Sequence, residues 1–271
     1  MNKIAVALSI YKSDTLIYLQ ESINSILNQT YKNFDLYITV DGDVSNDISD
    51  FLKKIENNKN IFIDYYSCNK GLAFRLNQII DEVVEKSIYD FVARMDADDI
   101  SELNRFQEQI NFFQEHHNVD VLGCDIIEID EYGNELFYKR MDADHNEIKT
   151  KIIKKCPFNH PSVMFKIDIF NNGFRYNSAL MNTQDYYLWV DLLSAGKIFS
   201  NVNKPLLKFR VNESFHNRRG FNKAINDVKS RLYAFQKLDV INISNILHVI
   251  ALFILRLSPS KVKKVAYKYL R

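Results

Sequence analysis

Residues 88–99 read IYDFVARMDADD, an apolar run of strand length that ends in three carboxylates, Asp96, Asp98 and Asp99. Like charges at this spacing repel one another, and a divalent cation among them relieves the repulsion. Mg²⁺ and Mn²⁺ prefer oxygen ligands and often share them with substrate phosphates. The stretch therefore predicts a metal site at the end of a strand. The alternative is that Asp98 or Asp99 caps a helix that starts near Glu102.

Strand-like and helix-like patterns alternate on both sides of this stretch. We expect strands at 3–10, 34–40, 61–65, 88–95, 119–130, 134–140, 162–166 and 205–211, and helices at 14–29, 45–57, 71–86, 102–116, 144–154, 184–195 and 221–239. This alternation predicts an α/β fold with a mostly parallel sheet flanked by helices. In such open sheets ligands bind beyond the carboxyl ends of the strands.

Two further polar motifs follow predicted strands. Asp41 comes directly after the second strand, where a carboxylate can accept hydrogen bonds from a ribose or a base. The motif Asn69-Lys70-Gly71 precedes a helix whose N-terminus offers N–H groups to an anion. The alternatives are an ordinary Asp-Gly turn and a helix entry that binds no ligand.

Composition excludes several classes of protein. The 271 residues are 46% hydrophobic and 25% charged, with only 7 Gly and 4 Pro, which excludes a disordered or collagen-like chain. A net charge of +1 gives no general reason to expect nucleic-acid binding. The charge is uneven, however, because residues 1–203 carry a net −11 and residues 204–271 a net +12. The basic segment indicates an anionic partner.

Neither cysteines nor the N-terminus indicate export. Cys68, Cys124 and Cys156 form no CxxC pair, so they predict buried thiols rather than a disulfide framework or a zinc site. The apolar run at 4–10 lacks a small-residue cleavage site and is interpreted as the first strand. We therefore expect a cytoplasmic protein.

Taken in order, the motifs resemble those of family 2 glycosyltransferases with the GT-A fold. Five motifs resemble those in the nucleotide-sugar-binding half of that family. They are Tyr11, Gln29-Thr30-Tyr31, Asp41, Asn69-Lys70-Gly71 and the run Arg94 to Asp99. Acceptor-side motifs of bacterial members that build surface polysaccharides are similar to the runs 160–165, 184–189 and 209–211. The resemblance covers about residues 3–219. It implies a Rossmann-like sheet divided into halves at 1–100 and 101–219, and a helical extension at 220–271.

The resemblance assigns roles on the donor side. Tyr11 and Asp41 would hold the uracil and the ribose. Asp98 would bind Mn²⁺ or Mg²⁺ directly, with Asp96 nearer the ribose or a metal-bound water. Further candidate contacts to the nucleotide or its diphosphate are Asn69, Lys70, Arg75, Arg94 and Arg210. A divalent cation on the diphosphate would stabilise the charge of the leaving group.

On the acceptor side, the resemblance places a general base at Asp185, at the start of the predicted helix 184–195. The neighbouring Tyr186, Tyr187 and Trp189 are suited to stacking on sugars. The alternative is that Asp185 interacts with the helix dipole and that the aromatic residues belong to the core.

The sequence departs from the family pattern at two positions. Gln184 stands where a Glu commonly precedes the base, and Asn212 stands where a His is common, so His216 is the candidate replacement as a metal or phosphate contact. The Gln-x-x-Arg-Trp signature of processive members is absent because Trp189 is the only tryptophan. This implies one sugar per acceptor.

The C-terminal region suggests a membrane surface. Residues 246–257 are apolar but too few to span a bilayer, and five cations follow at Lys261, Lys263, Lys264, Lys268 and Arg271. The pattern suits an anionic lipid surface, and the resemblance, whose members commonly use lipid-linked acceptors, implies a peripheral protein at the cytoplasmic face of the inner membrane. The alternative is a helix packed on the core with a solvated basic end.

Together these features predict an inverting, non-processive, metal-dependent glycosyltransferase. Its donor would be a UDP-hexose or UDP-N-acetylhexosamine, and its acceptor a hydroxyl of a lipid-linked oligosaccharide in surface-polysaccharide assembly. One alternative is a nucleotidyltransferase, although the usual glycine-rich loop near the first strand is missing. The other is a non-catalytic nucleotide- or glycan-binding protein, which would have no reason to keep Asp185 together with Asp96 and Asp98. The oligomeric state is left open.

Overall fold

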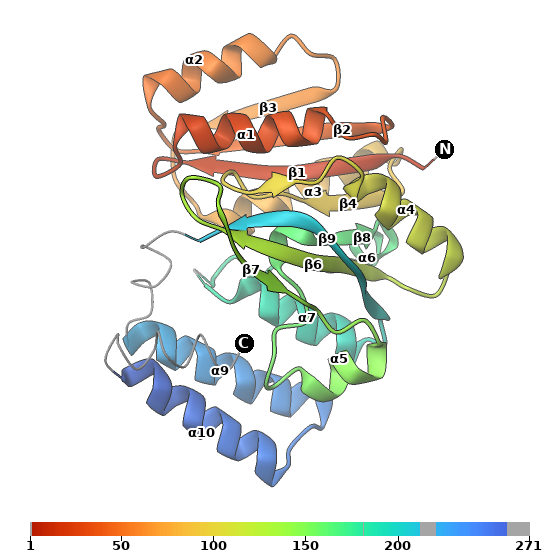
Figure 1. Ribbon diagram of the computed structural model, residues 1–271, viewed down its shortest axis with the longest axis vertical. Coiled ribbons are helices and arrows are strands. Elements are labelled where there is room, and N and C mark those ends of the chain that lie inside the picture. Colours follow the sequence, from red (N-terminus) through yellow and green to blue (C-terminus); the bar gives the residue numbers. More distant parts are fainter. Residues whose placement is uncertain (1, 181, 212–220, 259–271) are drawn as a thin grey trace.

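The computed structural model describes residues 2–180, 182–211 and 221–258. Its centre is a nine-stranded sheet with the order β3-β2-β1-β4-β8-β6-β9-β5 and with β7 paired to β6 (Figure 1). The strands are β1 (Ile4–Tyr11), β2 (Phe34–Asp41), β3 (Ile61–Tyr66), β4 (Phe91–Arg94), β5 (Ile100–Ser101), β6 (Val121–Ile129), β7 (Glu135–Lys139), β8 (Met164–Lys166) and β9 (Phe199–Arg210).

Helices cover both faces of this sheet. They are α1 (Leu16–Leu27), α2 (Asn46–Ile55), α3 (Leu72–Lys86), α4 (Arg105–Glu115), α5 (His145–Lys151), the short 3₁₀ helix η1 (His160–Ser162), α6 (Asp168–Asn171), α7 (Gln184–Ser194), α9 (Phe221–Leu238) and α10 (Ile243–Leu257). The alternation of helices and strands confirms the predicted α/β class.

The central strand β1 separates two layers of core. Leu8 and Ile10 pack with apolar residues of α1, α2 and α4, whereas Ala5 and Ala7 pack with those of α3. Successive side chains of a strand point to opposite faces, and a strand buried on both faces reads as a continuous apolar run. This explains why residues 4–10 carry no alternating polar pattern and why they resemble a signal sequence.

The first four strands of the sheet place the polar loops on one edge. β3, β2, β1 and β4 are parallel to one another, and Tyr11 at the end of β1 is the register neighbour of Asp41 at the end of β2. The carboxyl ends of these strands therefore meet at the same edge, as predicted for a ligand-binding sheet.

The second half of the sheet mixes directions. β8 is antiparallel to β4 and β6, β6 and β9 are parallel, and β7 returns antiparallel along β6. A short turn joins β6 to β7. Within it Gly133 adopts φ +88°, and the Asp130 carboxylate accepts hydrogen bonds from the N–H groups of Tyr132 and Asn134. Two strands joined by so short a turn must be antiparallel.

The predicted boundaries differ from the structure most at β9, which begins at Phe199 rather than at 205, and at β4, which begins at Phe91 rather than at 88. The elements β5, α6 and η1 were not expected. The early part of β9 contains Asn201, Asn203 and Pro205, and its pairing with β6 shifts register twice at Asp125. Polar residues, a proline and an irregular register hide the period of two that identifies a strand.

The C-terminal helices pack beside α7. In Figure 1, α9 lies next to α7 and α10 lies outside α9. The Tyr233 hydroxyl donates to Asp191 of α7 at 2.5 Å, and Arg256 of α10 pairs with Asp227 of α9 at 2.8 Å. Across the described ranges, no helix combines the length and the apolar character that crossing a bilayer requires. The proposed boundary near residue 219 lies outside the described residues and stays a prediction.

The cysteines only partly follow expectation. Cys124 is buried and Cys156 is half-buried, but Cys68 is exposed. Cys68 lies in the loop after β3, where its carbonyl accepts a hydrogen bond from Arg75 while the thiol remains at the surface. The prediction of three buried thiols is therefore wrong for Cys68.

Candidate functional site

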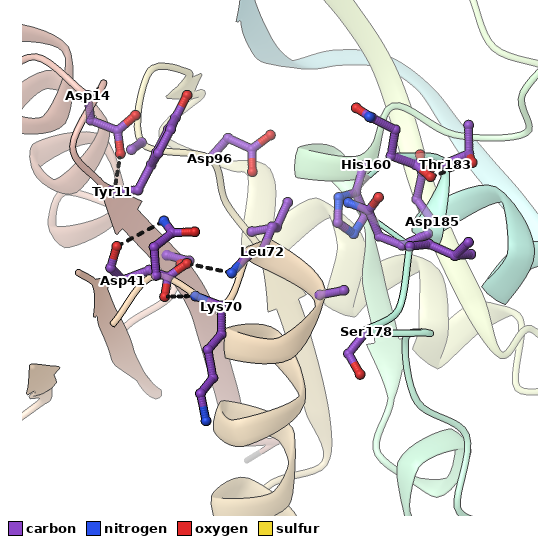
Figure 2. Close-up of a pocket in the computed structure, with 18 of the residues that line it drawn as sticks. Tyr11, Asp14, Asp41, Lys70, Leu72, Asp96, His160, Ser178, Thr183 and Asp185 are labelled. Atoms are coloured by element: carbon purple, nitrogen blue, oxygen red, sulfur yellow. Dashed lines mark hydrogen bonds between the residues drawn. The ribbon is translucent and has the colours of Figure 1, made fainter. Parts of the chain in front are cut away.

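A cavity of about 430 Å³ opens at the carboxyl edge of the parallel strands (Figure 2). It is lined by Ser9, Tyr11, Asp14, Asp41, Asn69, Lys70, Gly71, Leu72, Ala73, Asp96, Ala97, Asp98, His160, Ser178, Leu180, Asn182, Thr183, Gln184 and Asp185. The structure thus brings together the predicted Tyr11, Asp41, Asn69, Lys70, Asp96, Asp98 and Asp185. These residues lie up to 174 positions apart in the chain, from Tyr11 to Asp185. They come from the ends of β1 and β2, the loops after β3 and β4, and the first turn of α7.

Asp41 organises the loop that follows β3. Its carboxylate is only 3% exposed and accepts hydrogen bonds from the backbone N–H groups of Lys70 and Gly71, both at 2.8 Å. Its carbonyl accepts a third bond from the side chain of Asn69. Gly71 adopts φ +87°, a conformation that favours glycine, and α3 starts at the next residue. Asp41 therefore fixes the entry of α3 at the wall of the cavity.

The Lys70 side chain does not point into the cavity. Figure 2 shows it running away from the labelled carboxylates, and its ammonium lies 4.6 Å from the centre of the Phe74 ring. Only the backbone of Lys70 is directed toward Asp41. Its predicted contact with a diphosphate would require the side chain to change direction.

Two predicted arginines lie behind the cavity wall. Arg75 is 2% exposed and donates to Asp41 at 2.6 Å, to Gln78 and to the carbonyl of Cys68. Arg94 is 1% exposed and donates to the Asp96 carboxylate and to the carbonyls of Ala7 and Met95.

Protein acceptors bind all three nitrogens of Arg75 and both terminal nitrogens of Arg94, whereas the buried Nε of Arg94 has no partner among the described residues, so these side chains position other residues. Arg75 orients Asp41, and Arg94 orients Asp96. Neither arginine is among the residues that line the cavity, and the contact of each with a diphosphate stays a prediction.

The turn after β4 concentrates negative charge. Asp96 and Asp98 are half-buried, whereas Asp99 is 1% exposed, and one of its carboxylate oxygens has no hydrogen-bond partner among the described residues. Burial, followed by the charges of Asp98 and Asp96, raises the pKa of Asp99 well above its usual range. The first residue of α4 is Arg105 and its cap is Asn104, so neither Asp98 nor Asp99 caps that helix.

Arg210 holds this turn in place. Its backbone N–H donates to Asp99 at 2.9 Å, and its side chain donates to the carbonyl of Asp98 at 2.9 Å. The same guanidinium pairs with Glu21 of α1 at 2.5 Å and lies over the Tyr18 ring. Arg210 therefore joins β9, α1 and the acidic turn.

The partners of Arg210 were missed in the sequence because a single Glu or Tyr in a helix carries no signal of its contact. Arg210 itself does not line the cavity, and its contact with the nucleotide stays a prediction. Only the structure shows that Arg210 forms an ion pair with Glu21, which lies 189 positions away in the chain.

Asp185 faces the donor side of the cavity from α7. It is half-buried in the first turn of that helix, where the helix dipole favours a carboxylate. Thr183, the preceding cap residue, adopts φ +65°, a conformation that β-branched residues rarely take. Such backbone strain is found where a binding loop is held by its surroundings.

Two of the aromatic residues beside Asp185, Tyr186 and Trp189, belong to the core, which corrects the expectation that they stack on sugars. Trp189 is fully buried and stacks on Phe165, and Tyr186 is buried with its hydroxyl bonded to the carbonyl of Ile152. Tyr187 packs against Tyr233 of α9. These contacts seat α7 and thereby fix Asp185.

Two of the carboxylates that line the cavity, Asp96 and Asp98, lie where the sequence predicts a cation. Among the described residues, no group of three or more His, Cys, Asp or Glu side chains is gathered closely enough to hold a metal ion by itself. Mg²⁺ and Mn²⁺ sites of this kind are commonly completed by substrate phosphates. The negative charge that raises the pKa of Asp99 fits a cation there. His216, the third predicted ligand, lies outside the described residues.

Comparison with known proteins finds sequence similarity to glycosyltransferases over most of the chain. Residues 6–174 match the model of the family described as "Glycosyl transferase family 2". The chain is 29% identical to the amylovoran biosynthesis glycosyltransferase AmsE of Erwinia amylovora, with 97% of each chain covered. It is 28% identical to a UDP-Gal:alpha-D-GlcNAc-diphosphoundecaprenol beta-1,3-galactosyltransferase of Escherichia coli, covering 98% of this chain and 95% of that one.

A solved structure supports the fold. The structure of S. aureus TarS 1-349 in complex with UDP is similar with a TM-score of 0.67 at 16% identity, covering 98% of this chain and 75% of that chain. At this identity the likeness concerns the fold alone, and it agrees with the mixed sheet and flanking helices described above.

Proposed function

Because the chain belongs to glycosyltransferase family 2, we propose that it transfers one sugar from a nucleoside-diphosphate sugar to a hydroxyl of an acceptor glycan. The observation that carries the proposal is a single cavity with two sides. Tyr11, Asp41, Asp96 and Asp98 line it from the strand ends, and Asp185 lines it from α7. A nucleotide on the strand side would present its sugar to an acceptor beside Asp185.

The transfer is proposed as one displacement with inversion. The acceptor oxygen attacks the anomeric carbon and forms the new bond, while the bond from that carbon to the diphosphate breaks and the nucleoside diphosphate leaves. Asp185 takes the proton of the attacking hydroxyl. Such positioned base catalysis contributes about 10²- to 10⁴-fold to the rate.

The chain's own residues prepare the site for a charged donor. Arg94 orients Asp96, and Arg210 holds the turn that carries Asp98. A Mn²⁺ or Mg²⁺ ion bound by Asp96 and Asp98 would stabilise the charge of the departing diphosphate. Asp41, held by Arg75, stands where the ribose and base of a nucleotide would lie.

The proposed donor is a UDP-sugar, and the proposed acceptor is a lipid-linked glycan of surface-polysaccharide assembly. Support comes from the relatives: the Escherichia coli enzyme is named for UDP-Gal and for an acceptor linked to diphosphoundecaprenol, and the Erwinia amylovora enzyme for amylovoran biosynthesis.

A peripheral contact with the membrane is part of the same proposal. On α10, large apolar side chains are exposed at positions 243, 247, 250, 254 and 257, spaced three or four residues apart on one face. The opposite face is turned inward, where Asn245 is buried and Arg256 pairs with Asp227. An apolar stripe that faces outward, next to a segment rich in Lys, suits an anionic lipid surface.

The test compares Asp185→Asn with Asp191→Asn, an exchange on the same helix at a side chain that faces α9. With membranes that contain the lipid-linked acceptor, UDP-sugars and Mn²⁺, we expect Asp185→Asn to lower transfer at least about 100-fold while UDP affinity is unchanged. Asp191→Asn should retain transfer. Equal activity of Asp185→Asn and the unmodified protein would refute the base, and absence of transfer by the unmodified protein with every UDP-sugar would refute the donor class.

A further inference from the structure

His160 occupies the middle of the cavity. Figure 2 shows its ring between Asp96 on the strand side and Asp185 on α7, and all three residues line the same cavity. Under the proposed function, the diphosphate lies near Asp96 and the attacking hydroxyl near Asp185. The sugar in transit must therefore lie between them, next to His160.

The backbone of His160 is held on a rigid support. It begins the short helix η1, which is tied to β4 because the N–H of Arg94 donates to the carbonyl of Val163 at 2.8 Å. Within η1, the carbonyl of buried Ser162 accepts a bond from Gln109 of α4 at 2.9 Å. A side chain on such a support can recognise a ligand with little loss of conformational entropy.

The ring of His160 is oriented by a second chain of contacts. Its Nε2 lies 2.8 Å from the hydroxyl of Tyr176, which is 3% exposed. The backbone of Tyr176 is in turn clamped by Asn77 of α3, whose side chain accepts from its N–H at 2.9 Å and donates to its carbonyl at 2.8 Å. With Nε2 engaged by Tyr176, Nδ1 is the ring nitrogen left for a ligand.

The chemistry of this ring selects a neutral partner. Burial, together with the nearby charge of Arg94, holds the pKa of His160 well below its usual range, so the imidazole is uncharged at neutral pH. An uncharged ring nitrogen pairs well with a hydroxyl and gives no charge to offset a phosphate.

Resting on the proposed function, we propose that Nδ1 of His160 forms a hydrogen bond with a hydroxyl of the transferred sugar, and that Tyr176 positions the ring for it. His160 then contributes to the choice of sugar. A site built to bond a substrate hydroxyl discriminates against sugars that place this hydroxyl elsewhere.

The experiment separates recognition of the sugar from recognition of the nucleotide. His160→Phe keeps a ring against Trp189 and removes both nitrogens. Affinities for UDP, and kcat/KM for UDP-glucose, UDP-galactose and their N-acetylamino counterparts, are measured with Mn²⁺. We expect kcat/KM for the preferred sugar to fall about 10- to 100-fold and the preference among epimers to weaken, with UDP affinity changed less than about twofold.

A double-mutant cycle tests the role of Tyr176. Tyr176→Phe should cause part of the loss in kcat/KM, and adding it to His160→Phe should cause little further loss, because both act through one hydrogen bond. Tyr186→Phe is the control, since it also removes a buried tyrosine hydroxyl but bonds Ile152 outside the cavity.

Three results would overturn the proposal: unchanged kcat/KM and sugar preference in His160→Phe, a parallel loss of UDP affinity, or additive effects in the cycle. Each requires transfer by the unmodified protein. Absence of that transfer would overturn the proposed function itself and is therefore recognised separately.

Discussion

The guanidinium of Arg75 lies 2.6 Å from the carboxylate of Asp41, and both side chains are at most 3% exposed. The pair joins the end of β2 to the first turn of α3. The Asp41 carboxylate accepts hydrogen bonds from the Arg75 side chain and from the backbone N–H groups of Lys70 and Gly71. The geometry of the donor side therefore depends on the buried ion pair of Asp41 and Arg75, which the sequence alone does not reveal.

Removing one member of this pair should be costly. We expect Arg75→Met to lower the free energy of unfolding by about 3–5 kcal/mol, because it leaves the buried Asp41 carboxylate without its cation. Urea unfolding at neutral pH measures the change. Lys53→Met, which breaks an exposed pair with Asp50, is the matched control and should have little effect. Similar stability of the two variants would contradict a central role for the Arg75 pair.

Removing a carboxylate from the acidic turn should weaken metal-dependent binding. In Asp98→Asn, we expect the affinity for UDP in the presence of Mn²⁺ to fall at least about tenfold, while the much weaker metal-free binding is unchanged. Isothermal titration with and without Mn²⁺ measures both values. Asp50→Asn on α2 is the control for loss of an exposed carboxylate. Equal Mn²⁺ dependence in Asp98→Asn and the unmodified protein would exclude Asp98 as a ligand.

The three thiols should differ sharply in reactivity. Burial raises the pKa values of Cys124 and Cys156 to about 11, so only about a thousandth of either is a thiolate at pH 8. We expect one rapidly reacting thiol in the native protein with a disulfide reagent at pH 8, and three after unfolding in guanidinium. Cys68→Ser should abolish the rapid phase. A rapid phase that survives in this variant would show that Cys124 or Cys156 is accessible.

The outward stripe of α10 can be tested without disturbing the core. We expect the triple variant Leu247→Gln, Ile250→Gln and Ile254→Gln to bind vesicles containing phosphatidylglycerol at least about tenfold more weakly. The control exchanges three equally exposed apolar residues elsewhere, Ile17, Ile88 and Leu136, for Gln. Cosedimentation measures binding. Unchanged partitioning of the α10 variant would contradict a role of this face at the membrane.

The sequence predicted the elements whose patterns are local. β1, β2 and α3 were found with small errors because an apolar run or a helical period lies within each segment. Asp41 and Asp96 were singled out for the same reason, since each follows directly on a predicted strand, and Asp98 lies two residues beyond Asp96. The turn residue Gly71 was marked by the motif Asn69-Lys70-Gly71.

Contacts that depend on distant partners were not predictable in this way. Nothing in the sequence around Trp189 distinguishes a sugar platform from a core residue, and the structure shows that it packs on Phe165. Likewise the sequence does not show that the acceptors of Arg75, Arg94 and Arg210 are protein groups, because only the packing of the sheet brings these groups near.

The contacts of Arg94 limit movement within the cavity. Its backbone N–H holds η1, which carries His160, while its side chain holds Asp96. One buried residue thus links the strand side to the centre of the cavity, and close-packed interiors deform little. The floor of the cavity should move as one body, so the entry of a donor and the exit of a product must be accommodated at the rim, where Asn182 and Lys70 are exposed.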